Sequence, residues 1–149
     1  MEIMSNDKKI KLFLVDDDAL YLKMLEIELL QFGDYILENF PTGEMCIANL
    51  SQKPDVIVLD YYLDSLDKNA MNGIQVLDEI KSINADIPVV MLSSQDKIEV
   101  AVDCMHHKAF DYIVKSETEF VRLRKAISTI THIKRTEKAL NWYMDETSK

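Results

Sequence analysis

Cysteine, long apolar runs and positive charge are all scarce in this sequence. Its two cysteines, Cys46 and Cys104, lie in apolar segments without metal-site spacing, and a single pair is no disulfide framework for a domain of this size. We therefore expect buried thiols. No apolar run approaches the roughly 20 residues that a bilayer requires, and residues 1–9 hold no apolar signal-peptide segment. These absences predict a cytoplasmic protein without membrane insertion.

The formal net charge of -9 argues against direct nucleic-acid binding, because phosphate contacts need clustered Lys and Arg side chains. An acidic chain is better suited to a metal site and to protein partners. The length of 149 residues, 48% of them hydrophobic, is enough for one domain with a substantial core and too little for two ordinary ones. We predict a single domain.

Five apolar runs predict strands. Three are compact and do not alternate with polar residues, as in strands buried on both faces of a parallel sheet: Ile10–Val15, Val56–Leu59 and Pro88–Leu92. Two weaker runs, Tyr35–Phe40 and Tyr112–Val114, complete the set.

Segments with helical spacing of apolar residues lie between these runs. Their apolar positions are Leu22, Leu25 and Leu29; Ile74, Leu77 and Ile80; and Ile98, Val102 and Met105. Thr42 resembles a helix N-cap, and a last helix begins near Glu119 and runs past Trp142. Strands that alternate with helices predict an α/β fold with a parallel sheet and right-handed crossovers.

In such a sheet the ligand crevice lies at the carboxyl ends of the strands. The side chains found there are Asp16, Asp17 and Asp18 after the first run, Asp60 after the third, Ser93 and Ser94 after the fourth, and Lys115 after the fifth. Carboxylates about 4 Å apart repel by roughly 4 kcal/mol at an effective dielectric constant near 20. The cluster therefore needs a cation or protonation, and Mg²⁺, which commonly binds through one or two carboxylates, fits it.

Four motifs resemble those of a known family. They are LFLVDDD at Leu12–Asp18, VIVLD at Val56–Asp60, PVVMLSS at Pro88–Ser94 and DYIVK at Asp111–Lys115. In this order they resemble the CheY-like receiver domain of two-component response regulators. The resemblance implies a doubly wound, flavodoxin-like sheet of five parallel strands in the order 2-1-3-4-5, with helices on both faces. We expect an N-terminal tail over residues 1–9, a receiver domain over 10–131, and an extension of the final helix with a C-terminal tail over 132–149.

The resemblance implies a switch that takes a phosphoryl group in a phosphorelay. Asp60 is then the phosphoacceptor, and Lys115 neutralises charge on the phosphoryl group. The implied Mg²⁺ ligands are Asp16, Asp17, Asp60 and the backbone carbonyl of Tyr62. The implied phosphodonor is a sensor histidine kinase or a phosphotransfer protein. The chain would be no enzyme beyond its own Mg²⁺-dependent phosphoryl transfer and dephosphorylation.

Other residues are implied to transmit or time the signal. Ser93 matches the hydroxyl that turns to the phosphoryl group, and Tyr112 matches the aromatic switch of the last strand. Together they would alter the face formed by the last strand and the helices before and after it, where a downstream target protein binds. A buried structural tyrosine explains Tyr112 nearly as well. Tyr62 and Gln95 match positions that tune dephosphorylation, and the bulk of Tyr62 predicts a long-lived phosphorylated state.

The sequence departs from the family at two places. The loop Asp60–Gly73 is longer than usual, lacks the usual proline and carries two extra acids, Asp64 and Asp67, which we expect to be solvated. Ser116 replaces the proline that commonly follows the lysine, so a trans peptide bond is expected there.

The sequence after Ile130 is too short for a DNA-binding or enzymatic output domain, which predicts a stand-alone receiver that acts through another protein. Ala126, Ile130, Ile133 and Leu140 make part of an apolar seam that Glu137 breaks. Two interpretations stay open. The seam forms a homodimer or docks a partner, or the final helix folds onto its own domain.

Two other functions compete with the receiver. In a haloacid-dehalogenase-like phosphohydrolase, Asp16 would be the nucleophile and Asp18 the acid–base residue, but no acidic pair follows Lys115 and Asp60 would have no role. A pseudo-receiver would bind partners without phosphorylation. That class usually lacks the acceptor, an acid or the lysine, and all are present here.

Overall fold

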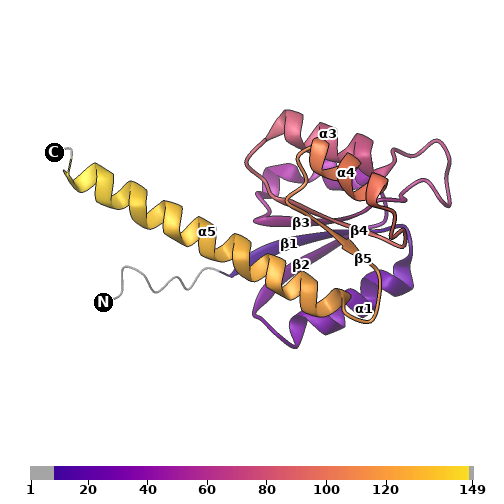
Figure 1. The fold of residues 1–149 in the computed structure, drawn as a ribbon, viewed down its shortest axis with the longest axis horizontal. Coiled ribbons are helices and arrows are strands. Elements are labelled where there is room, and N and C mark those ends of the chain that lie inside the picture. The colour runs from indigo at the N-terminus through magenta and orange to yellow at the C-terminus, as the bar shows by residue number, and fades with distance from the viewer. Residues whose placement is uncertain (1–8, 148–149) are drawn as a thin grey trace.

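Five parallel strands form one sheet in the computed structural model, which describes residues 9–147 (Figure 1). The strands are β1 (Ile10–Val15), β2 (Tyr35–Phe40), β3 (Val56–Asp60), β4 (Val89–Ser93) and β5 (Asp111–Val114). Their order across the sheet is β2-β1-β3-β4-β5, as predicted. Each predicted run forms a strand whose ends lie within one residue of the expected ones.

Helices cover both faces of the sheet. They are α1 (Ala19–Leu30), α2 (Gly43–Ala48), α3 (Gly73–Ile83), α4 (Ile98–His106) and α5 (Glu119–Thr147), with a short 3-10 helix, η2 (Leu50–Gln52), after α2. Helices α1 and α5 pack on one face, and α2, α3 and α4 pack on the other (Figure 1). The predicted doubly wound α/β fold is confirmed.

Successive residues of a central strand enter opposite layers of the core. In β1, Leu12 and Leu14 pack on the side of α1 and α5, whereas Phe13 and Val15 pack on the side of α2, α3 and α4. Because both faces are covered, the strand needs apolar residues at every position. Strand β2 lies at the edge of the sheet and is mostly half-buried, which explains its weaker apolar pattern.

Capping side chains set the starts of the helices near the strand ends. Thr42 accepts a hydrogen bond from the Met45 backbone N–H and caps α2, as predicted. Asn72 and Gln75 form a reciprocal capping box at the start of α3. These caps satisfy backbone N–H groups that a helix leaves without partners.

Helix α4 forms where helical spacing predicts it, but the apolar residues that revealed it face outward. Ile98, Val102 and Met105 are 73%, 47% and 48% exposed. The fully buried residue of α4 is Cys104. Periodicity identifies a stripe on a helix, but the layout of the sheet decides which side is covered.

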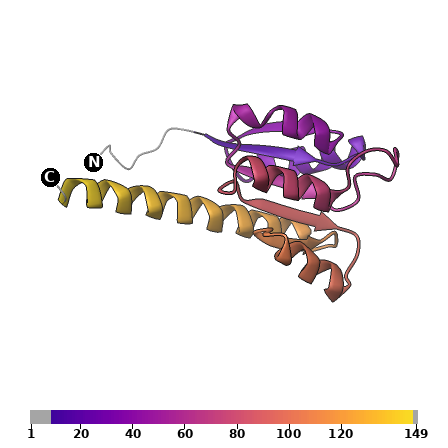
Figure 2. The ribbon, with the colours of Figure 1, turned by 90° about the horizontal axis from the view of Figure 1, so that it is seen from above.

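Helix α5 has two parts with different surroundings. Its first part buries Ala126 and Ile130 against the sheet, and its last part extends away from the other elements (Figures 1 and 2). Leu140 and Trp142 on that last part are 57% and 55% exposed. The predicted seam is therefore split, because only its first half packs on its own domain.

The structure also bears on the cysteines and on membrane-spanning segments. Cys46 and Cys104 are buried free thiols, as expected. Among residues 9–147, no helix combines the length and the apolar character needed to cross a bilayer.

Candidate functional site

The polar residues predicted at the strand ends meet at one edge of the sheet. Asp16 follows β1, Asp60 ends β3 and Lys115 follows β5. The Lys115 Nζ lies 2.9 Å from Asp16 Oδ2 and 3.3 Å from Asp60 Oδ1. Strands β1, β3, β4 and β5 are neighbours in that order, so their carboxyl ends place these three residues side by side.

Three carboxylates form a cluster that suits a divalent cation. Asp16, Asp17 and Asp60 each offer one oxygen, and these oxygens lie within 4.8 Å of one another. Oxygen donors at this separation fit a hard cation such as Mg²⁺, which keeps several waters and needs few protein ligands. The donor set therefore fits the predicted metal.

Burial and mutual repulsion perturb the acids of this cluster. Burial, followed by the charge of Asp16, raises the pKa of Asp60 to about 7, although Lys115 opposes the rise. Burial likewise raises the pKa of Asp16. Burial by itself would lower the pKa of Lys115, but Asp60 and Asp16 outweigh it and the pKa is raised overall. The ammonium therefore stays charged beside two acids that resist ionisation.

The three consecutive aspartates do three different things. Asp16 is 2% exposed and bonds Lys115, whereas Asp17 accepts a hydrogen bond from the Leu66 backbone N–H at 3.4 Å. Asp18 accepts hydrogen bonds from the first turn of α1 and caps that helix. A phosphohydrolase would need Asp18 as its acid–base residue, so its use as a cap weighs against that alternative.

A cavity of about 670 Å³ opens above the cluster. Its walls are Asp16, Asp17, Asp18, Ala19, Leu20, Asp60, Tyr62, Ser65, Leu66, Ser94 and Lys115. The backbone carbonyl of Tyr62, a predicted metal ligand, accepts a weak hydrogen bond from the Ser65 hydroxyl at 3.5 Å. The cavity is roomy enough to admit a phosphoryl group to Asp60.

Ser93 and Tyr112 lie behind the cavity and are joined through one residue. Ser93 is fully buried, and its Oγ accepts a hydrogen bond from the Gln95 backbone N–H at 3.1 Å. The Tyr112 hydroxyl donates a short hydrogen bond to the Gln95 carbonyl, with the ring 7% exposed. Ser94, not Ser93, lines the cavity. The Ser93 hydroxyl is therefore engaged inside the domain and is not a lining residue of the cavity.

The long loop after Asp60 approaches the site through backbone, not through its extra acids. The Asp67 side chain accepts a hydrogen bond from the Asn69 backbone N–H at 2.9 Å, which shapes a turn in the loop. Asp64 lines a different hollow, beside Tyr61. Neither acid is part of the carboxylate cluster.

The structure adds two residues that sequence reasoning missed. Tyr21 on α1 and Glu119 at the start of α5 meet beside Lys115. No motif marks either residue, because they lie 98 positions apart and follow no strand end. Neither the burial of Glu119 nor its hydrogen bond with Tyr21 is visible in the sequence.

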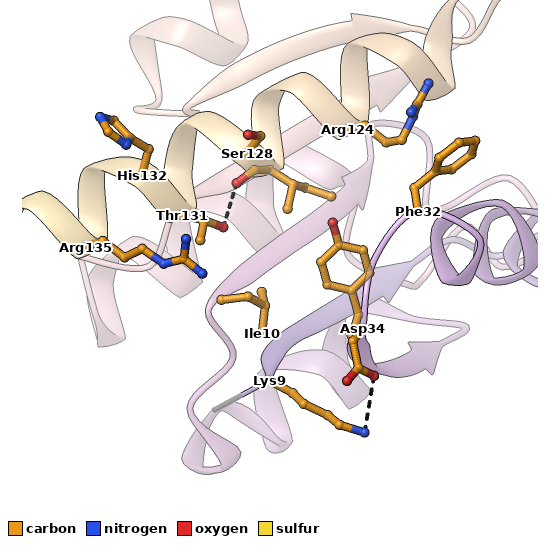
Figure 3. A pocket seen from close by; sticks show the side chains of 11 residues that line it. Lys9, Ile10, Phe32, Asp34, Arg124, Ser128, Thr131, His132 and Arg135 are labelled. Carbon is orange, nitrogen blue, oxygen red and sulfur yellow. Dashed lines mark hydrogen bonds and ion pairs between the residues drawn. The ribbon is translucent and has the colours of Figure 1, made fainter. Parts of the chain in front are cut away.

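A larger cavity, of about 750 Å³, lies at the opposite edge of the sheet, between α5 and the first residues of β1 and β2 (Figure 3). Its charged side chains do not converge. The Arg124 guanidinium stacks on the Phe32 ring at 3.7 Å, and the Lys9 ammonium pairs with Asp34 at 3.3 Å. Size alone does not mark the functional site.

Comparison with known proteins gives a match along most of the chain. Residues 12–128 match the family model of the response regulator receiver domain. The receiver domain of a putative LuxO repressor protein from Vibrio parahaemolyticus has a TM-score of 0.77 at 21% identity, covering 89% of this chain and 98% of that one. At that identity the structure supports the fold alone.

Two curated relatives contain a similar segment inside longer proteins. A protein-glutamate methylesterase/protein-glutamine glutaminase of Clostridium acetobutylicum is 35% identical over 118 residues, covering 76% of this chain and 32% of that protein. The transcriptional regulatory protein ZraR of Salmonella typhimurium is 30% identical over 129 residues, covering 86% of this chain and 28% of ZraR. This chain thus spans about a third of the length of these relatives.

The family model includes every strand end that contributes to the cavity. The cluster of acids with Lys115 does not favour a pseudo-receiver, and the family match does not favour a phosphohydrolase. The chain belongs to the response regulator receiver domain family and is a receiver of two-component phosphorelay signalling.

Proposed function

We propose that Asp60 accepts a phosphoryl group and that Lys115, Asp16 and Asp17 support the transfer. The observation that carries the proposal is the convergence of the Lys115 ammonium on Asp16 and Asp60, with Asp17 in the same cluster. Asp60 is 5% exposed yet lines the cavity, so a donor can reach a carboxylate that is otherwise shielded from water.

Phosphoryl transfer to Asp60 forms one bond to phosphorus and breaks another. One Asp60 carboxylate oxygen forms a bond to phosphorus while the phosphorus–nitrogen bond to the donor's imidazole breaks, and the released nitrogen takes up a proton. In dephosphorylation, which ends the signal, water attacks the phosphorus, the bond to Asp60 breaks, and inorganic phosphate leaves. Lys115 offsets the negative charge that gathers on the phosphoryl oxygens in both steps.

Asp16, Asp17, Asp60 and the Tyr62 carbonyl would hold Mg²⁺, which supplies charge neutralisation for the phosphoryl group when bound. Tyr62 also lines the cavity, so its ring restricts the approach of water to a modified Asp60. Gln95 acts through its backbone, which joins Ser93 to Tyr112.

An exposed apolar stripe beside the cavity suits the phosphodonor. Leu20, Met24 and Ile27 lie at helical spacing on α1 and are 80%, 42% and 51% exposed, and Leu66 across the cavity mouth is 81% exposed. Such a surface next to a reactive carboxylate fits the apolar helices of a histidine kinase or phosphotransfer protein. Docking there would bring the donor's phosphohistidine over Asp60.

A second face suits the output. The exposed stripe Ile98, Val102 and Met105 on α4 lies next to β5, which carries Tyr112. A turn of Ser93 toward the phosphoryl group would release the Gln95 segment that precedes α4 and free Tyr112 to move. A downstream target protein would then bind the α4–β5–α5 face, in the cytoplasm.

The receiver domain and the extension of its last helix divide the chain near residue 131. We assign residues 10–131 to the receiver domain and residues 132–149 to an extension that serves output or self-association. The tail expected over residues 1–9 and the last two residues fall mostly outside the described range, 9–147. A homodimer through the extension and action as a stand-alone receiver stay predictions.

One experiment tests the proposal directly. The protein is incubated with Mg²⁺ and acetyl phosphate, and intact mass is measured for the wild type, Asp60→Asn and the loop control Asp64→Asn. We expect a phosphoryl adduct in the wild type and in Asp64→Asn, and none in Asp60→Asn. An adduct of equal yield in Asp60→Asn would overturn the assignment.

A further inference from the structure

Lys115 has a third neighbour besides the two acids. Its Nζ lies 4.1 Å from the centroid of the Tyr21 ring, on α1. A cation over an aromatic face is attracted by the negative charge of that face. The ammonium is thus held between Asp16 and Asp60 on one side and an aromatic ring on another.

The Tyr21 ring is itself anchored to the start of α5. The Tyr21 hydroxyl donates a hydrogen bond to Glu119 Oε2 at 2.8 Å. Glu119 is the first residue of α5 and is 6% exposed, a degree of burial that is rare for a glutamate. A phenol that donates to a carboxylate has a more electron-rich ring, and such a ring attracts the Lys115 ammonium more strongly.

Burial and the carboxylate together disfavour ionisation of Tyr21, so its pKa is raised and the hydroxyl stays a donor. Burial also raises the pKa of Glu119, while the Tyr21 hydrogen bond and the charge of Lys115 oppose the rise. The hydrogen bond therefore joins a protonated Tyr21 hydroxyl as donor to the Glu119 carboxylate as acceptor.

We propose that Tyr21 and Glu119 are positioning residues that hold the Lys115 ammonium at Asp60 and couple its place to the first turn of α5. This inference rests on the proposed phosphorylation of Asp60. Lysine is a compact charge on a flexible stem, so contacts on only one side leave its head free to move. The ring supplies the missing side, and Glu119 fixes the ring.

Through these contacts a change at the site can reach the first turn of α5. A phosphoryl group on Asp60 adds negative charge in front of Lys115 and draws the ammonium toward it. Any such shift alters the contact with Tyr21 and, through the Tyr21 hydroxyl, the position of Glu119. The path to α5 is separate from the one that runs from Ser93 through Gln95 to Tyr112.

The test measures the phosphorylation rate by acetyl phosphate at saturating Mg²⁺, over a range of donor concentrations. We expect Tyr21→Leu to lower the maximal rate by about tenfold, the size of one cation–π contact, with little change in half-saturating donor concentration. Tyr21→Phe keeps the ring but loses the hydroxyl, and Glu119→Gln keeps an acceptor but loses the charge. Both should lower the rate by roughly threefold.

Matched controls separate positioning from stability. Tyr35→Phe alters another partly buried tyrosine far from the site, and Glu117→Gln alters a neighbouring exposed acid; both should keep the wild-type rate. In a Lys115→Ala background, Tyr21→Leu should have no further effect, because the ring then has no ammonium to hold. A full additional tenfold loss in that background would overturn the inference.

A readout without phosphorylation keeps the two proposals distinguishable. By NMR, the Lys115 Hε protons should show an upfield ring-current shift that disappears in Tyr21→Leu but stays in Tyr21→Phe and Tyr35→Phe. Absence of that shift in the wild type, or an unaltered rate in all three Tyr21 and Glu119 variants, overturns the inference while the Asp60 adduct stands. Absence of the adduct with the shift present overturns the proposed function alone.

Discussion

Among single residues of the site, the carboxylates of Asp16 and Asp60 repel each other. Asp16 and Asp60 are buried together, and the Asp60 pKa is raised to about 7. The folded protein therefore binds a proton that the unfolded chain has already lost above about pH 4. Without Mg²⁺, stability should fall as the pH rises from about 4 to about 7.

Removing the Asp60 charge should relieve this repulsion. We expect Asp60→Asn to raise the free energy of unfolding at pH 8 without Mg²⁺ by on the order of 2 kcal/mol. Urea denaturation measures the difference, with Asp64→Asn as the control from the same loop. Mg²⁺ should stabilise the wild type more than Asp60→Asn. Equal stability of the two proteins at pH 8 would show that the cluster is not strained.

Gly73 lies where backbone closely approaches Asp60, the proposed phosphoacceptor. A Cβ at this position would lie 2.6 Å from the Asp60 carbonyl oxygen and 2.7 Å from Tyr61 Cα. We expect Gly73→Ala to destabilise the fold by roughly 1–3 kcal/mol and to slow phosphorylation, because backbone next to Asp60 has to shift. At Gly33 an added Cβ meets only the end of the Tyr35 side chain, so Gly33→Ala should cost less. Thermal unfolding of both variants decides between them.

Tyr62 provides a kinetic prediction. Its side chain lines the cavity over Asp60, and a smaller polar residue would admit water more easily. We expect Tyr62→Asn to shorten the lifetime of the phosphorylated form by several-fold. Timed loss of the adduct after removal of the donor measures this. An unchanged lifetime would mean that Tyr62 does not shield the phosphoryl group.

At the scale of elements, a histidine joins α3 to α4. His107 follows α4, and its Nδ1 lies 2.7 Å from Asp78 Oδ1 on α3, with its Nε2 3.5 Å from Asp103 Oδ1. The hydrogen bond with Asp78, opposed only in part by burial, raises the His107 pKa. When it is protonated, the imidazole therefore forms an ion pair that joins the end of α4 to α3.

The sign of the pH effect follows from that shift. A histidine with a raised pKa in the folded state contributes stability below about pH 6.5, and this contribution is lost as the pH rises through the folded pKa. We expect His107→Gln to lose stability relative to wild type at pH 6 but little at pH 9. His106→Gln, the neighbouring exposed histidine, is the control. A pH-independent difference in urea midpoint would contradict the interpretation.

For the molecule as a whole, the extension of α5 adds an exposed apolar surface outside the sheet and its helices. Ile133, Leu140 and Met144 lie at heptad spacing and are exposed, and Glu137 occupies the seam position between them. A single charge in so short a seam would weaken any association of two copies through it.

Completing the seam should strengthen association. We expect Glu137→Leu to lower the dimer dissociation constant by at least about tenfold, whereas Lys138→Leu, which adds the same side chain off the seam, should have a smaller effect. Sedimentation velocity over a range of protein concentrations measures both. Equal effects of the two variants would show that the extension does not pair along this seam.

Local sequence patterns were enough to predict the five strands and to place Asp16, Asp60 and Lys115 at strand ends, because apolar runs and their ends are local properties of the chain. Parallel strands then bring their carboxyl ends to one edge wherever the helices lie. The sequence pattern did not predict that Asp18 caps α1.

Contacts between residues of different elements could not be predicted from the sequence pattern. The contact of Tyr21 with Glu119, the outward face of α4 and the engagement of Ser93 by Gln95 depend on how helices pack on the sheet and on how the β4–α4 segment folds. Such contacts have no sequence period, because packing joins residues by shape and burial, not by spacing. The predicted cluster around Asp60 therefore rested on local strand ends together with the strand order that the resemblance implied, whereas the contacts of Tyr21 and Glu119 depend on packing.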